Sequence, residues 1–449
     1  MTGLPFLIAF VVAIVVMLLM ISRWKIHPFL SIMVIAIVLA LLAGLPLPQV
    51  PKVIGDGFAA TFTSIGIVII LGALIGAILE KTGAALTLAD VVIRLVGERR
   101  PDLAMELMGW IVSIPVFCDS GFVILNPIRK ALAKRTGAPS VTLTVCLACG
   151  LYIAHVFIPP TPGPIAAAQT LGIGENLLLV MGLGVVVSVF PLVAGYVYAR
   201  LIGRRVRVIE DLSGNAETYE DLKAEYGQLP GAWESLGPLI VPILLMALSS
   251  VASMLHWTGW GGDLCLFLGH PMIALAVGAL LAILLLIRAG KNNDLFSITD
   301  ETLRTVGPIL FVTAAGSVLG RVIAASNLME YITDNAPVLQ QLGVLFPFLV
   351  AALFKSAQGS STVAITTTAG LIAPLLPALG LVSPAEVSLA VLAIGAGAMT
   401  VSHANDSYFW VVTRFGELSV EDGYRAHTLA TLVMGVAAIV GIMIISLFL

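Results

Sequence analysis

Charged residues are scarce in this sequence of 449 residues. Lysine, arginine, aspartate and glutamate make up 11% of the chain, whereas soluble proteins carry about 25%. Hydrophobic residues make up 59%, so the chain has too few polar groups to cover a surface that faces water. The formal net charge of -3 provides no basic footprint for nucleic acid. The composition therefore excludes a soluble or nucleic-acid-binding protein and indicates an all-α polytopic protein embedded in a lipid bilayer.

Cysteine is also rare, with four residues in the chain. Their spacing matches neither a disulfide framework nor a zinc site. Cys146 and Cys149 form a CxxC inside an apolar run without a basic neighbour, so we interpret them as small packing residues rather than redox groups. The sequence contains no HExxH motif, no phosphate-binding loop and no nucleophile elbow. We therefore expect no cofactor, no metal site and no enzymatic activity.

Long apolar runs, in contrast, are abundant. A helix needs about 20 apolar residues to cross a bilayer, and runs of this kind recur along the whole chain. Clear spans lie near residues 4–22, 29–47, 58–79, 176–202, 236–255, 267–288, 305–325 and 426–448, and less regular ones near 138–157 and 385–403. Arg23 and Lys25 follow the first span. The positive-inside rule places them in the cytoplasm and predicts that the N-terminus lies outside.

Residues 103–128 do not fit a simple alternation in which each apolar span carries the chain to the other side of the membrane. This apolar segment has basic residues at both ends, and its roughly 26 residues are too few for the two crossings, about 40 residues, that would return the chain to the same side. The sequence predicts a re-entrant hairpin that opens to the cytoplasm, with its turn marked by Pro115, Asp119, Ser120 and Gly121. Irregular backbone at this depth requires cover from protein or water.

A second hairpin is predicted at 343–380, opening to the outside. Its polar stretch runs from Lys355 to Thr362 between two apolar arms. Two other apolar helices should be broken. Around 155–164, four prolines in six residues cannot continue a helix, and around 402–407 a cluster of polar residues interrupts the apolar run.

The two halves of the chain share an order of features. GALIGAILEKTG at 72–83 resembles GSVLGRVIAASN at 316–327, and a polar hairpin followed by a broken helix comes after each. The first half, residues 1–203, is predicted to start outside. The second half, residues 235–449, starts inside, and the charged segment 204–234 is a cytoplasmic linker. This order predicts an inverted repeat of about five plus five transmembrane helices, a design that many secondary transporters share.

Titratable groups in the middle of a membrane are costly, so they are candidates for function. Asp119 lies at the first hairpin, where poor hydration favours a protonated acid; a residue that caps a half-helix is the alternative. His155 and His403 occupy matching positions in the two halves, although each could also be a hydrogen-bonded packing residue. We expect Asp119, His155 or Asp406 to carry a proton.

Hydroxyl, amide and cationic groups near the same segments are suited to a small carboxylate. A half-helix that begins at the second hairpin would direct its N-terminus at an anion. Lys355 could neutralise a substrate carboxylate, or it could be paired within the protein. The predicted substrate-binding residues are Ser120, Gly121, Thr161, Lys355, Gln358, Gly359, Ser360, Ser361, Thr362, His403 and Asn405.

Other polar residues are expected to be structural. Glu80 and Lys81 should pair locally at a cytoplasmic helix end. The remaining histidines lie near predicted interfaces and are expected to have no direct role in function; they are His27, His256, His270 and His427.

Four motifs carry a resemblance to a known family. They are FCDSGFVILNPI at 117–128, HVFIPPTPGP at 155–164, QGSSTVAI at 358–365 and SHANDSYFW at 402–410. In this order they resemble the gluconate permease family of bacterial sugar-acid:proton symporters, over nearly the whole chain. The resemblance implies uptake of gluconate and related hydroxy acids across the inner membrane, an elevator-type movement and a homodimer.

The leading hypothesis is therefore a proton-coupled symporter of a small sugar acid. Three alternatives stay open. The same fold could carry glycerate, fructuronate, idonate or D-serine; it could use sodium, because hairpin carbonyls and Ser or Asn oxygens also suit a hard cation; or the protein could be an anion channel. Duplicated hairpins that open to opposite sides favour alternating access over a channel.

Overall fold

The computed structural model describes residues 4–88, 91, 100–114, 116–206, 228–255, 257–326 and 340–449. These residues form helices joined by turns, with no strand among them, which confirms the all-α prediction. Pro115 and most of the predicted linker 204–234 lie outside the described residues. Within the described part, six helical stretches are long and apolar enough to cross a membrane: Ser140–Thr170, Gly174–Ile202, Ala232–Ser249, Pro271–Arg288, Asn292–Ala324 and Val420–Ser446.

The first helices match the predicted spans with shifted ends. They are α1 (Leu4–Ser22), α2 (Pro28–Leu42), α3 (Val50–Thr61) and α4 (Ile67–Lys81). A π-helical turn, Phe62–Gly66, joins α3 to α4, so the predicted span 58–79 is the end of one helix and most of the next. Helix α2 ends five residues early because Gly44, with φ of +79°, turns the chain.

The first predicted hairpin is a pair of short helices. They are α6 (Pro101–Val112) and α7 (Cys118–Thr136). The predicted position of the turn was wrong, because Asp119, Ser120 and Gly121 lie in the first turn of α7 and not in the loop before it. An acidic residue in this position interacts favourably with the positive end of the helix dipole, so the helix begins before Asp119.

In each half, a few non-helical residues separate a helix from a shorter one that follows it. Helix α8 (Ser140–Phe157) is followed by α9 (Pro162–Thr170) and then α10 (Leu177–Ile202). In the second half, the hairpin is α18 (Leu345–Gln358) with α19 (Ser361–Ile372), and the broken helix is α20 (Pro384–Met399) with α21 (Ser407–Phe415). The short α22 (Val420–Gly423) and a π-helical turn lead into α23 (Leu429–Ser446).

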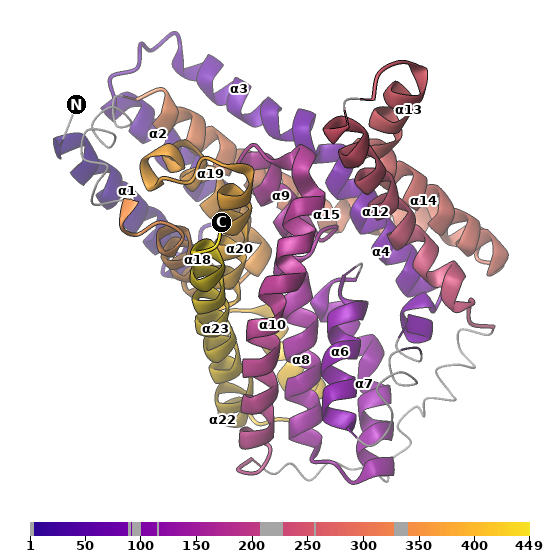
Figure 1. Ribbon diagram of the computed structural model, residues 1–449. Coiled ribbons are helices and arrows are strands. Elements are labelled where there is room, and N and C mark those ends of the chain that lie inside the picture. Colours follow the sequence, from indigo (N-terminus) through magenta and orange to yellow (C-terminus); the bar gives the residue numbers. More distant parts are fainter. Residues whose placement is uncertain are drawn as a thin grey trace.

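The first four helices of the second half form a second group. They are α12 (Ala232–Met254), α13 (Trp260–Gly269), α14 (Pro271–Arg288) and α15 (Leu295–Ala324). Helix α14 packs against α12 and α4, and α15 packs against α2, α3 and α4. In Figure 1, α4, α12 and α14 lie to the right of the column formed by α8 and α10.

The hairpins and broken helices pack in matched pairs. Helix α6 lies against α8 and α18 against α20, while α10 lies against α8 and α23 against α20. Across the halves, α7 contacts α21 and α19 contacts α9. The α6–α8 contact is close enough to require glycine, because a Cβ at Gly150 would lie 1.9 Å from the carbonyl oxygen of Glu106. This packing places the chain breaks of both halves in one region.

Candidate functional site

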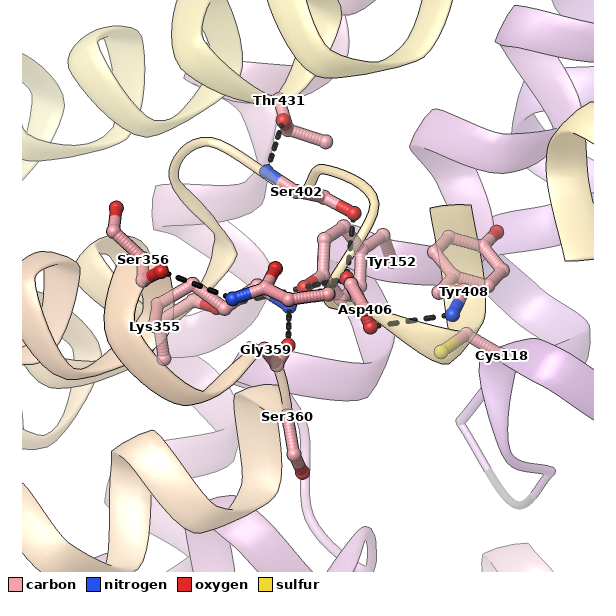
Figure 2. A network of polar contacts seen from close by, with 12 residues as sticks. Cys118, Tyr152, Lys355, Ser356, Gly359, Ser360, Ser402, Asp406, Tyr408 and Thr431 are labelled. Carbon is pink, nitrogen blue, oxygen red and sulfur yellow. Dashed lines mark hydrogen bonds and ion pairs between the residues drawn. The ribbon is translucent and has the colours of Figure 1, made fainter. Parts of the chain in front are cut away.

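A buried ion pair lies where the second hairpin meets the second broken helix (Figure 2). Lys355 Nζ is 2.5 Å from Asp406 Oδ2, and the two side chains are 0% and 4% exposed. Lys355 also donates to the carbonyl of Gly359 and lies 5.5 Å from the centre of the Tyr152 ring. Because a buried charge is costly unless it is paired, these contacts explain how Lys355 is accommodated. Of the two alternatives for Lys355, the structure displays the internally paired one.

Asp406 is the centre of a wider polar network. The Ser402 hydroxyl donates to Asp406 Oδ2 at 2.5 Å, and the backbone N–H of Tyr408 donates to Oδ1 at 3.2 Å, so that Asp406 caps α21. His427 Nε2 lies 3.1 Å from the Ser402 oxygen. Sequence reasoning missed His427, because it lies 25 residues from Ser402 in a π-helical turn whose local sequence carries no motif. The sequence placed His427 near a predicted interface, whereas the structure buries it beside Ser402.

Gly359 lets the tip of the second hairpin fit against the second helix break. Its φ is +92°, and a Cβ here would lie 2.0 Å from the carbonyl oxygen of Asn405. The Asn405 amide donates to the Ser356 carbonyl at 2.9 Å, while Asn405 Oδ1 is buried without a hydrogen-bond partner among the described residues. The predicted tight turn at Gly359 is confirmed, and it joins two sites that lie far apart in the sequence.

The hydroxyl groups after Gly359 begin helix α19. Ser360 caps this helix by accepting from the Val363 N–H at 3.3 Å. Ser361 and Thr362 are buried in its first turn, and Ser361 hydrogen-bonds to the Tyr152 side chain. Gln358 is the last residue of α18. The structure therefore brings this predicted polar stretch to the ion pair.

The first half contributes groups that are less fully bonded. Asp119 lies near Ser407 at the start of α21, and its Oδ1 is buried and has no partner among the described residues. His155 is 4% exposed and lies in the last turn of α8. Its Nδ1 is also buried without a hydrogen-bond partner among the described residues. Helices α7 and α9 begin after Phe117 and Thr161 without a side-chain cap.

Three predicted residues have mainly local contacts. The Thr161 hydroxyl donates to the carbonyl of Ile158 at 2.8 Å. Gly121 packs closely against Leu151. His403 is half-buried in the second break, where its carbonyl accepts from the Asp406 N–H at 2.8 Å. The two matched histidines therefore differ in their surroundings.

A cavity of about 430 Å³ opens beside the first hairpin tip. Its walls are α4, the start of α7 and α15, and they include Glu80, Phe117, Ser120, Glu301 and Thr305. Ser120 and Glu80 therefore lie close together on this wall, although they are far apart in the sequence. The sequence predicted only a local role for Glu80, because nothing nearby indicates that α4 passes the hairpin tip.

The structure combines helices of membrane length with two hairpins, two broken helices and a buried polar network at the breaks. This combination defines a membrane transporter. The chain belongs to the GntP permease family, since residues 5–448 match the model described as GntP family permease. It is 32% identical to the inner membrane permease YgbN of Escherichia coli K12 over 94% of both chains. It is also 29% identical to a gluconate permease of Pseudomonas aeruginosa over 98% of this chain and 97% of that one.

The fold is also found in a solved structure. The YdaH transporter of Alcanivorax borkumensis superposes with a TM-score of 0.67 at 15% identity, covering 94% of this chain and 99% of that one. At this identity the likeness concerns the fold alone. The family and the helices together identify a multi-pass inner-membrane transporter rather than an enzyme.

Proposed function

We propose that the protein imports gluconate or a related small sugar acid together with a proton. The observation that carries this proposal is the buried Lys355–Asp406 pair at the meeting point of hairpin and helix break. A cation in this place can bind a carboxylate, and its present partner is a group that a proton can neutralise. The similarity to a gluconate permease supports the substrate class.

Competition for Lys355 would couple the two fluxes. A proton on Asp406 removes the negative partner of Lys355, and the substrate carboxylate then takes its place. The empty site holds one cation and one anion, and the loaded site again holds one cation and one anion with a neutral acid beside them. Binding of the proton alone or of the anion alone would leave a net buried charge, which costs several kcal/mol. Only the empty and the doubly loaded sites would cross the apolar barrier readily.

Neighbouring groups are suited to bind the rest of the substrate. Hydroxyls of Ser120, Ser361 and Thr362 would bond to the hydroxyl groups of a sugar acid. The uncapped start of α7 supplies backbone N–H donors to an anion, and the buried, unpartnered Nδ1 of His155 points to a polar ligand in the same region. Asp119 and His155 are the other two candidate proton carriers.

The proposed movement is an elevator-type shift of the hairpins and broken helices against α4, α12, α14 and α15. Two features support an inverted repeat of residues 1–203 and 235–449: the matched α6–α8 and α18–α20 contacts, and the reciprocal α7–α21 and α9–α19 contacts. The outside N-terminus and the homodimer belong to the same proposal.

The test is uptake into proteoliposomes that contain the purified protein. Gluconate, idonate, fructuronate, glycerate and D-serine are offered under an inward proton gradient, a sodium gradient or neither. We expect accumulation of a sugar acid with the proton gradient, together with alkalinisation outside. Accumulation with the sodium gradient alone would show that sodium, and not the proton, is the coupling ion. Equilibration without accumulation would indicate a channel.

A further inference from the structure

Glu80 connects the first hairpin to an open cavity. It lies in the last turn of α4, half-buried, near Ser120 in the first turn of α7. The same carboxylate lines the cavity of about 430 Å³ between α4, α7 and α15. Neither the sequence pattern nor the proposed site accounts for a carboxylate in this position.

The positive charges around the cavity indicate that it lies at the cytoplasmic end of α4. Lys81 lines the cavity, and Lys291 donates to the Lys81 carbonyl at 2.9 Å. Basic residues at helix ends mark the cytoplasmic side. The cavity is polar on much of its wall and large enough to contain water.

The hairpin tip lies between this cavity and the central network. Ser120 lines the cavity together with Glu80, while the preceding residue, Asp119, lies near Ser407 at the start of α21. Asp406, which caps α21, is the immediate neighbour of Ser407 in the chain. Consecutive residues of α7 therefore face the proposed proton site on one side and a water-accessible carboxylate on the other.

We propose that Glu80 is the group that receives the coupled proton from the hairpin tip and releases it to the cytoplasm. This inference rests on the proposed proton symport. The proton leaves a carboxyl group at the tip, binds to the Glu80 carboxylate and passes to water in the cavity, and no other bond changes. Chains of carboxylates serve as proton relays in other membrane proteins.

The groups that face Glu80 suit a transient proton acceptor. Glu301 of α15 also lines the cavity, Lys81 is the last residue of α4, and Ser120 lies in the first turn of α7. The negative charge of Glu301 favours proton binding at Glu80, and the positive charge of Lys81 favours its loss.

The decisive variant is Glu80→Gln, because an amide keeps the size and polarity of the side chain but cannot take up a proton. Right-side-out membrane vesicles are used to measure accumulation of labelled gluconate, or of the acid found active, at several internal pH values. We expect accumulation to fall about a hundredfold or more, the lower end of the range for a positioned proton-transfer group. Exchange of internal for external substrate, which needs no net proton release, should fall far less, and the dependence of uptake on internal pH should disappear.

Two further variants separate this role from others. Glu80→Asp retains a titratable group and should restore part of the accumulation. Thr305→Val changes the wall of the same cavity without removing a charge near Glu80 and should retain both coupling and the internal pH dependence. If Glu80→Gln accumulates substrate as the wild type does, the inference is overturned and Glu80 only holds the hairpin tip. If the wild type itself shows no proton-driven uptake, the proposed function fails first.

Discussion

The two halves of this protein build the same arrangement of helices but satisfy their polar groups differently. In the second half, each short helix after a break begins with a capping side chain, Ser360 for α19 and Asp406 for α21. In the first half, α7 and α9 begin after Phe117 and Thr161 without such a cap. The first half therefore leaves backbone N–H groups for other partners.

The titratable groups follow the same division. Lys355 and Asp406 of the second half neutralise each other in the interior. Asp119 Oδ1 and His155 Nδ1 of the first half are buried without a hydrogen-bond partner among the described residues. The second half therefore contains a neutralised charge pair, and the first half contains titratable groups without hydrogen-bond partners. The proposed binding of an anion together with a proton requires both.

Breaking the ion pair should have the largest effect. Asp406→Leu leaves Lys355 buried without its counter-charge, so we expect a loss of about 3–5 kcal/mol in stability. Thermal unfolding in detergent, followed by size-exclusion chromatography or tryptophan fluorescence, measures it. The double variant Lys355→Met/Asp406→Leu should recover most of the stability and still fail to transport. Equal stability of the single and double variants would contradict the role of the pair.

Asp119→Asn tests the other half of the comparison. No buried cation depends on this carboxylate in the described contacts, so stability should change by less than about 1 kcal/mol. If Asp119 carries the proton, accumulation driven by a proton gradient should fall at least tenfold, as for loss of a positioned proton-transfer group, while substrate exchange is far less affected. Should accumulation survive, His155→Gln and Asp406→Asn identify the carrier instead.

Gly359→Ala addresses the contact between the second hairpin and the second break. The added methyl group meets the Asn405 carbonyl at 2.0 Å, whereas Gly44, also with positive φ, has nothing within 4 Å. Both variants suffer the backbone strain of about 1–2 kcal/mol. Gly359→Ala should cost about 2 kcal/mol more, the usual effect of overpacking, and should impair uptake. Equal stabilities for the two variants would show that the hairpin tip can move away from Asn405.

Ser360→Ala should have the smallest effect. It removes the cap of α19, which is worth about 1 kcal/mol. Ser360→Asn retains a capping oxygen and should be close to the wild type in stability. Because Ser360→Asn keeps the cap but lacks the serine hydroxyl, its Michaelis constant for the substrate is compared with that of the wild type. A higher constant would show that the hydroxyl also contributes to binding, and an equal one would show that Ser360 serves only as a cap.

Much of the fold could be predicted from the sequence because its elements depend on local chemistry. Apolar length indicates a membrane helix, and the prolines after His155 or the polar run around Asp406 indicate a break. Ends were less accurate. The start of α7 lies before Asp119, and π-helical turns at Phe62–Gly66 and Tyr424–Thr428 have no local sequence pattern that we could recognise.

The sequence by itself determined three things: that the chain lies in a lipid bilayer, at which positions its helices break, and which polar residues lie at those breaks. Each of these depends on residues within one helix length. Only the tertiary structure decided the partners. Lys355 pairs with Asp406 across 51 residues, and Ser120 reaches Glu80 on another helix. A buried charge is stable only beside its counter-charge, yet many carboxylates could satisfy that requirement, and only the packing of α18 against α20 and of α7 beside α4 and α21 selects the one that does.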